Sequence, residues 1–445
     1  MSGGKLPEGW VNTTIGDISV KCSQRVPDEN EQFIYVDIGS INRELKVIEN
    51  PQYLVGKDAP SRARKEIKAH DIIVSLTRPN LNAVALVSEK YDEQIASTGF
   101  EVIRPTQVES RYIFALVRSR HFIDAISGLV QGALYPAAKS SDVQSYEFPL
   151  PPLAEQKIIA EKLDTLLAQV DCTKARLEQI PQILKHFRQA VLASVVCGKL
   201  SKNTGQWKTY LLKNICISIS DGDHQAPPKS ETGIPFLVIS DVNKGQIDFE
   251  NVSRWVPESY YESLKEIRKP FQNDILYTVT GSYGIPVIVN TTKPFCFQRH
   301  IAIIKPNSSL IDYKFLAFYL ESPQIFKHAS DVATGTAQKT VSLSSLRNFE
   351  LSVPSLEEQA EIVRRVELLF AYADTIEKQV NSALTRVNSL TQSILAKAFR
   401  GELTAQWRAE NPDLISGENS AAALLEKIKA ERAASGGKKA SRKKA

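Results

Sequence analysis

Two clusters of basic residues could bind the phosphates of a nucleic acid. The first cluster consists of Lys57, Arg62, Arg64, Lys65 and Lys68. The second consists of Lys265, Arg268 and Lys269. Lys and Arg side chains neutralise phosphates and displace counterions, so clusters of this kind are typical of nucleic-acid contacts. A solvated protein surface is the alternative interpretation of each cluster taken alone.

Polar loop tips after predicted strands could read base edges. These tips are residues 77–82 and residues 280–284. Arg, Asn and Gln can form paired hydrogen bonds to bases, whereas Lys more often binds phosphate. The candidate DNA-binding residues of the first half are Arg43, Lys57, Arg62, Arg64, Lys65, Arg78, Asn80, Asn82 and Lys139. The candidates of the second half are Lys244, Arg268, Lys269, Ser282, Tyr283, Arg299, His300, Gln338 and Lys339.

Catalytic motifs are missing where they would be needed. A phosphate-binding loop requires Gly-Lys followed by Ser or Thr. The Gly-Lys pairs that begin at residues 4, 56, 198 and 437 are followed by Leu, Asp, Leu and Lys. An adenine methylase needs an Asn/Asp-Pro-Pro-aromatic motif, and Asn411-Pro412-Asp413 lacks its second proline and its ring. We therefore expect neither catalytic nor metal-binding residues in this chain.

Two other interpretations stay open at this point. Asp28, Glu44 and Lys46 could form a magnesium-dependent nuclease, because two carboxylates and a lysine can hold Mg²⁺ and activate water. Their spacing is loose, so the pattern is weak evidence. The other possibility is a coiled-coil organiser of partner proteins that never meets DNA.

Composition restricts the class of protein. The chain has 445 residues, of which 42% are apolar and 24% are charged, as is usual for a globular protein. No apolar run approaches the roughly 18 residues of a membrane helix, and the N-terminus lacks the apolar core of a secretory signal. The five cysteines are scattered, which favours a reducing cytoplasm. The net charge of +5 equals the five basic residues among the last eleven, so any nucleic-acid binding must depend on local patches.

A long internal repeat organises the chain. Residues 151–200 and 354–403 are identical at 13 of 50 positions, whereas unrelated segments would match at roughly 3. Both copies place apolar residues at alternating steps of three and four, the period of a coiled-coil seam. A stripe that covers only its own globular core is the alternative. We expect each copy to form a long helix, with Pro181 kinking the first helix or opening a new one.

Shorter similarities extend the repeat into the flanking regions, which show β-branched runs closed by turn residues. The predicted fold is α+β, with two mixed domains joined by two long helices and related by a pseudo-two-fold repeat. Because the ends of a compact domain lie close together, the helices should be antiparallel. The expected segments are 1–150 and 204–352 as recognition domains, 151–203 and 353–407 as helices, and 408–445 as a tail with a short helix and a basic end.

The sequence resembles the specificity subunits of type I restriction–modification systems, in particular their enterobacterial A-type branch. The resemblance covers essentially the whole chain. It is strongest in Pro151-Pro152-Leu153-Ala154-Glu155-Gln156 and in the segment from Glu358-Gln359 to Phe399-Arg400-Gly401-Glu402-Leu403. The Pro-x-Leu-x-Glu-Gln signature that occurs twice is specific to this family.

This resemblance implies a function for each part of the chain. Each recognition domain would read one half of a bipartite, asymmetric site in double-stranded DNA, and the helices would set the gap between the halves. Two methyltransferase and two restriction subunits would be the partners. S-adenosylmethionine, ATP and Mg²⁺ would be bound by those partners, and no cofactor by this chain.

Overall fold

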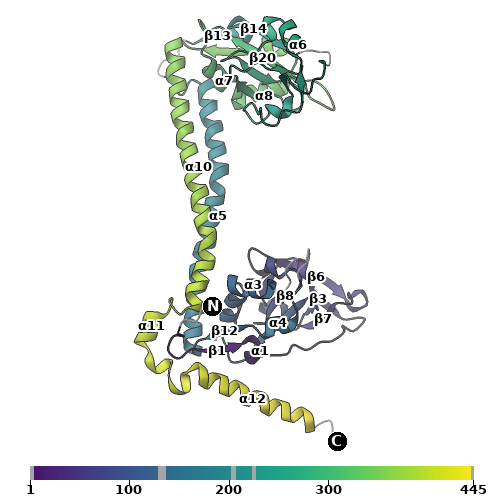
Figure 1. The fold of residues 1–445 in the computed structure, drawn as a ribbon, viewed down its shortest axis with the longest axis vertical. Coiled ribbons are helices and arrows are strands. Elements are labelled where there is room, and N and C mark those ends of the chain that lie inside the picture. The colour runs from purple at the N-terminus through teal and green to yellow at the C-terminus, as the bar shows by residue number, and fades with distance from the viewer. Residues whose placement is uncertain (1–4, 129–136, 202–206, 223–226, 442–445) are drawn as a thin grey trace. The chain divides into compact units, whose positions relative to one another are not determined.

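The computed structural model describes residues 5–128, 137–201, 207–222 and 227–441. It divides into two compact units (Figure 1). Unit 1 consists of Met1–Arg176 and Ala383–Ala445, and unit 2 consists of Leu177–Ser382. Two helices of 44 residues each, α5 (Leu153–Val196) and α10 (Leu356–Phe399), contribute one segment to each unit.

The described part of unit 1 contains two four-stranded sheets, with strand orders β6-β3-β10-β7 and β2-β11-β8-β9. Two antiparallel pairs, β1 with β12 and β4 with β5, complete its strands. β10 pairs parallel with β3, and the other strand pairs are antiparallel. The strands are β1 (Val11–Thr14), β2 (Ser19–Val20), β3 (Gln32–Val36), β4 (Ile41–Asn42), β5 (Val47–Ile48), β6 (Gln52–Val55), β7 (Ala63–Glu66), β8 (Ile72–Ser75), β9 (Val84–Leu86), β10 (Ile95–Ser97), β11 (Phe100–Pro105) and β12 (Glu147–Leu150).

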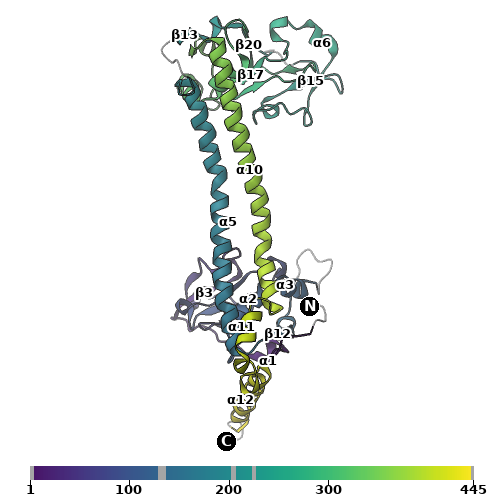
Figure 2. The ribbon, with the colours of Figure 1, turned by 90° about the vertical axis from the view of Figure 1, so that its left-hand side faces the viewer.

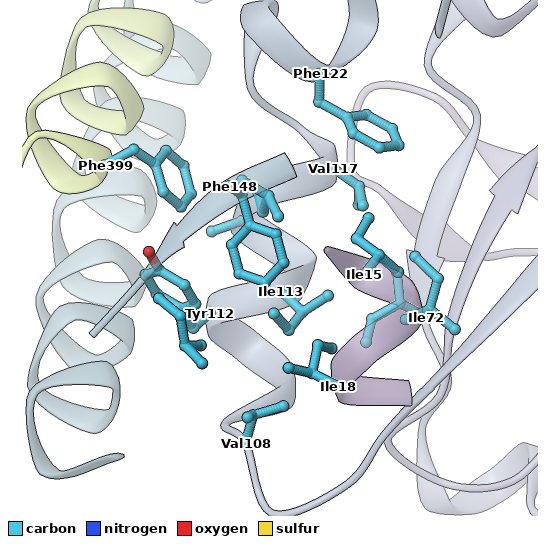
Figure 3. Packing of buried hydrophobic residues seen from close by; sticks show 14 of the residues in the cluster. Ile15, Ile18, Ile72, Val108, Tyr112, Ile113, Val117, Phe122, Phe148 and Phe399 are labelled. Carbon is cyan, nitrogen blue, oxygen red and sulfur yellow. The ribbon is translucent and has the colours of Figure 1, made fainter. Parts of the chain in front are cut away.

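Short helices and segments of the two long helices pack in the main hydrophobic core of unit 1. The short helices are α1 (Ile15–Ile18), α2 (Ser110–Val117), α3 (Arg120–Ser127) and α4 (Ser140–Gln144). Tyr112 of α2 and Phe399 of α10 meet edge to face, with their ring centroids 5.4 Å apart (Figure 3). Helix α10 therefore belongs to the core of a domain that begins almost four hundred residues earlier.

Unit 2 repeats this plan. Its described residues form a four-stranded sheet of order β14-β20-β17-β18, a three-stranded sheet of order β16-β15-β19 and the pair β13-β21. The strands are β13 (Lys208–Leu211), β14 (Cys216–Asp221), β15 (Ile234–Leu237), β16 (Trp255–Val256), β17 (Ile275–Thr278), β18 (Pro286–Ile288), β19 (Cys296–Phe297), β20 (Ile301–Pro306) and β21 (Glu350–Val353). The helices are α6 (Glu258–Ser263), α7 (Tyr313–Glu321), α8 (Pro323–Val332) and α9 (Leu343–Arg347).

The repeated signature has one structural role in both units. The side-chain amide of Gln156 donates to the Pro151 carbonyl at 2.8 Å, and its oxygen accepts the Glu109 backbone N–H at 2.9 Å. Gln359 makes the equivalent bonds to Pro354 and Asp312, at 2.9 and 2.7 Å. Both glutamines are fully buried. Each one therefore ties the start of a long helix to the loop that precedes α2 or α7, and satisfies backbone groups that burial would otherwise leave unpaired.

A buried ion pair is also repeated in two equivalent sheets, β2-β11-β8-β9 of unit 1 and β14-β20-β17-β18 of unit 2. Arg104 on β11 pairs with Asp71, which precedes β8, at 2.8 Å. In unit 2, Lys305 on β20 pairs with Asp274, which precedes β17, at 2.5 Å. The aspartates also accept backbone N–H groups from Lys68 and Phe271, respectively. These bonds fix the turns that lead into β8 and β17, the strands that carry the candidate loops.

The long helices pack in antiparallel fashion within each unit (Figure 2). In unit 1, Leu163 at the start of α5 shares a core with Leu395 at the end of α10. In unit 2, Val191 at the end of α5 shares a core with Ile362 at the start of α10. Arg188 on α5 also pairs with Asp374 on α10 at 2.5 Å. The predicted α+β class with two long helices is confirmed.

Details of the helices differ from expectation. Helix α5 is continuous through Pro181, so the proline does not open a new helix. Leu390, which belongs to the apolar stripe of α10, is 43% exposed, so the stripe is not buried at every position.

The tail forms α11 (Ala405–Glu410) and α12 (Ala421–Ser441). Helix α12 buries Leu424 and Ile428 in the core of unit 1, and its Arg432 donates to the carbonyl of Gly16 in α1. Helix α12 is therefore longer than the short helix that was expected in the tail at 421–434. Arg442, Lys443 and Lys444 of the expected basic end lie outside the described residues.

Candidate nucleic-acid interface

Three candidate segments of unit 2 converge at the end of β17. The Gly281 N–H donates to the Lys339 carbonyl at 3.0 Å, and the Thr340 hydroxyl bonds the Thr280 hydroxyl at 3.2 Å. The Val279 N–H donates to the His300 carbonyl at 2.9 Å. These bonds bring together the loops that carry Ser282, Gln338 and Arg299, all of which are exposed. The segments are far apart in the chain, and they form one polar surface, which we call surface 2.

Tyr283 on surface 2 is held in a fixed orientation. Its ring stacks on Phe326 of α8 with centroids 5.8 Å apart, and its hydroxyl bonds the Ser330 hydroxyl at 3.1 Å. A Cβ at Gly284, whose φ is +86°, would lie 2.7 Å from the Phe326 ring. Only glycine therefore permits this stack. Phe326 remains 47% exposed, so the aromatic pair offers an apolar face next to polar side chains.

His300 contributes a neutral ring to surface 2. Burial lowers its pKa, and the neighbouring Arg299 cation lowers it further. A neutral imidazole has one donor and one acceptor nitrogen, so it can hydrogen-bond a base edge without adding charge.

A comparable surface forms in unit 1 at the end of β8, and we call it surface 1. The Leu76 carbonyl accepts the Ala138 N–H at 2.8 Å, which places Lys139 beside the 77–82 loop. The Leu76 N–H donates to Gly99, and the Thr98 N–H donates to the Arg62 carbonyl, both at 2.9 Å. Surface 1 therefore joins Arg62, Arg78 and Lys139. The exposed Thr98 was not among the residues predicted from the sequence. In the internal repeat, its turn is equivalent to the 298–300 turn of unit 2.

The backbone at the tip of surface 1 is unusual. Arg78 has a φ of +49° and Asn82 a φ of +46°, the left-handed region that non-glycine residues rarely adopt. Between them, Pro79–Leu81 forms a single 3₁₀ turn that leaves Asn80 exposed. Strained residues of this kind persist where the surrounding structure holds them, often at functional sites.

Two candidates are buried. Lys65 is 8% exposed and donates to the Phe100 carbonyl at 2.6 Å and to Glu101 at 3.1 Å. Asn82 donates its side-chain amide to the Val117 carbonyl at 2.8 Å. Both side chains position the fold around surface 1, and in this conformation they do not offer their polar atoms to a duplex.

The remaining candidates lie on other elements. Arg43 occupies the exposed turn between β4 and β5, and Lys57 a 3₁₀ turn after β6. Arg64 lies on β7, and Lys244 in an exposed turn of unit 2. Arg268 lies 3.8 Å from Asp221, and Lys269 pairs with Glu266 at 2.7 Å. Internal ion pairs reduce what these last two cations can offer to a phosphate.

The residues of the nuclease alternative do not form a site. Asp28 lies beside Gly56, near the end of β6. Lys46 instead donates to the Asn82 carbonyl at 2.6 Å. Across the described ranges, no three His, Cys, Asp or Glu side chains gather as a metal site would require. The arrangement does not favour metal-dependent cleavage by this chain.

No helix in the described part of the chain is both long enough and apolar enough to span a membrane.

Comparison with known proteins gives a consistent result. Residues 7–182 and 205–386 match the family described as the type I restriction modification DNA specificity domain. The chain is 43% identical to the specificity subunit of the type I restriction enzyme EcoKI of Escherichia coli strain K12, and the alignment covers 100% of both. It is 51% identical to the EcoBI specificity subunit of Escherichia coli over 347 residues, which are 73% of this chain and 72% of that protein.

A solved structure is similar as well. The HsdS subunit from Thermoanaerobacter tengcongensis aligns with a TM-score of 0.68 and 29% sequence identity. The alignment covers 90% of this chain and 99% of that subunit.

Proposed function

The chain belongs to the family of type I restriction–modification DNA specificity subunits, which recognise DNA without catalysing a reaction, and we propose that each of its units reads one half of a bipartite DNA sequence. One observation carries the proposal: surfaces 1 and 2 follow β8 and β17, which are equivalent strands of the internal repeat. Equivalent surfaces on two repeated domains suit a target with two parts.

The two half-sites should differ in sequence. Surface 1 presents Arg78, Asn80 and Lys139, whereas surface 2 presents Ser282, Tyr283 and Gln338. Arginine pairs best with guanine, and asparagine or glutamine with adenine, so unlike side chains read unlike bases. The site as a whole would therefore be asymmetric.

The long helices would determine the gap between the half-sites. Helices α5 and α10 have 44 residues each, so each is about 66 Å long at 1.5 Å per residue. An antiparallel helix pair is stiff where its apolar seam is buried, and Val380 and Val387 of α10 are buried residues of this seam. Their length supports a role as a spacer.

The helices also offer surface for partner subunits. Leu368 and Tyr372, one turn apart on α10, are 62% and 63% exposed. Exposed apolar residues next to each other often mark protein interfaces. The proposed partners are two methyltransferase subunits and two restriction subunits, which would bind S-adenosylmethionine, ATP and Mg²⁺.

A footprinting experiment tests this function. The chain assembled with its methyltransferase subunits should protect two short patches of DNA separated by an unprotected gap. Loss of protection on removal of the chain is the matched control. A single continuous footprint would reject the reading of two separated half-sites, and no footprint would favour an organiser that does not touch DNA.

A further inference from the structure

A cavity of about 270 Å³ lies within unit 1 where the turn between β4 and β5 approaches α5 and α10. Its lining includes Lys46, Asn82, Arg118, Asp171, Lys174 and Gln392. Asn82 belongs to the 77–82 loop of surface 1, so the cavity adjoins the candidate reading loop. The proposed half-site reading does not use Lys46 or Arg118.

Arg118 lacks an anionic partner in direct contact. Its guanidinium lies over the Phe114 ring at 5.1 Å, and no described residue accepts a hydrogen bond from it. Burial lowers its pKa, while Asp171 and Asp164 of α5 raise it from a distance. A guanidinium has five N–H donors in a planar fork, so the N–H groups of Arg118 that face the cavity can still donate hydrogen bonds to a ligand.

Lys46 places a second cation at the same cavity. Its ammonium donates to the Asn82 carbonyl at 2.6 Å, and its backbone has a φ of +59°. Burial lowers its pKa to about 8, and the neighbouring Arg118 and Arg43 cations contribute to that decrease. Two half-buried cations that repel each other in the free protein would be stabilised by an anion between them.

The two cations that the half-site reading does not use suit an anion with two oxygens. Lys46 and Arg118 both line the cavity, together with the carboxylates of Glu44 and Asp171. The guanidinium fork matches two oxygens of a phosphate, and Lys46 adds a point charge beside it. Asn82, which lines the cavity, is only two residues away from Asn80 at the tip of the loop.

We infer that this cavity holds one phosphodiester of the DNA backbone next to the half-site read by surface 1. The contact is independent of sequence, and it fixes the register of the reading loop on the duplex. This inference rests on the proposed function, because it needs DNA to lie along surface 1. A carboxylate from a partner protein is the competing occupant.

Salt titration of DNA binding tests the inference on the full chain assembled with its methyltransferase subunits. Arg118→Met and Lys46→Met should each weaken binding about tenfold, equally for cognate and unrelated duplexes. Each should also make the slope of log K against log salt shallower by about 0.9, the value of one phosphate contact. Arg118→Lys should retain the slope. Lys429→Met, which removes an exposed charge of α12, is the control and should leave it unchanged.

Neutral backbone substitution locates the phosphate. Duplexes that carry one methylphosphonate should lose affinity for the wild-type complex at one position, and Arg118→Met should lose nothing further at that position. Melting curves show whether each variant is folded, and Lys46→Met provides the second reading if Arg118→Met is not.

Different results overturn different claims. An unchanged slope in both charge-removing variants, or additive losses at every methylphosphonate position, would reject the phosphate site. Weaker assembly with the methyltransferase at an unchanged slope would assign the cavity to a partner carboxylate. A wild-type complex without preference for any sequence would reject the proposed half-site reading itself, while its slope on unrelated DNA would still report on the cavity.

Discussion

The buried carboxylate of Glu155 joins three separate parts of unit 1. It accepts hydrogen bonds from the Trp10 indole at 2.8 Å, the Thr404 hydroxyl at 2.6 Å and the Arg408 guanidinium at 2.9 Å. The equivalent glutamate of the repeat, Glu358, has a buried Oε1 with no partner among the described residues. Among the described residues, the carboxylates of these two equivalent glutamates therefore differ in their hydrogen-bond partners.

Replacing these two glutamates should have unequal effects. Glu155→Ala leaves the largely buried Arg408 charge without a carboxylate partner, although it still donates to the Gly401 carbonyl, and we expect a loss of about 3–5 kcal/mol in the free energy of unfolding. Glu358→Ala is the matched control and should cost about 1 kcal/mol or less. Denaturant unfolding followed by circular dichroism measures both. Equal losses in the two variants would show that the Glu155 bonds contribute little.

Arg78 tests base reading by surface 1. If its guanidinium contacts a base, Arg78→Ala should relax the requirement at one position of one half-site, at a cost of about 1–3 kcal/mol. The other half-site should be read as before. Methylation rates on a set of duplexes with single base changes measure this. A uniform loss across all sequences would assign Arg78 to phosphate binding instead.

At the scale of elements, the sequence predicts the helices better than the loops. The alternating steps of three and four residues and the duplicated signature depend on local spacing, so α5 and α10 could be predicted, although they end at Val196 and Phe399, before the expected limits of 203 and 407. The role of Gln156 could not, because its partner Glu109 lies 47 residues away. Surface 2 depends on the bond between Gly281 and Lys339, which no local pattern indicates.

Whether a candidate side chain is buried or exposed in the fold could not be predicted from residue type alone. Lys65 belongs to a basic cluster in the sequence, yet β7 alternates its side chains and turns this one inward to Glu101. Arg78 and Lys139 were both proposed, but their proximity follows from the backbone bond between Leu76 and Ala138. Residue type thus identified candidates, and long-range hydrogen bonds determined which of them meet.

Helix length should control the gap in the DNA target. Inserting four residues near the middle of both α5 and α10 adds about one turn, or roughly 6 Å, to each helix. We expect the methylated sites to keep both half-sites while the gap increases by about two base pairs, since each base pair spans about 3.4 Å. Sequencing of methylated DNA measures the gap. An unchanged gap would contradict the spacer role.

At the scale of the whole molecule, charge is concentrated at one end of the sequence. The last eleven residues carry five basic residues and no acidic one, so residues 1–434 are neutral overall. Attraction to DNA must then come from local surfaces such as surfaces 1 and 2, and not from the average charge of the chain.

Exchange of one recognition domain tests the central claim most directly. Residues 11–150 of this chain would be replaced by the corresponding residues of the EcoKI specificity subunit, and methylated sites would be mapped in cells that carry either version. We expect one half of the site to change, while the other half and the gap stay the same. A site that changes in both halves, or in neither, would contradict the reading of one half-site by each unit.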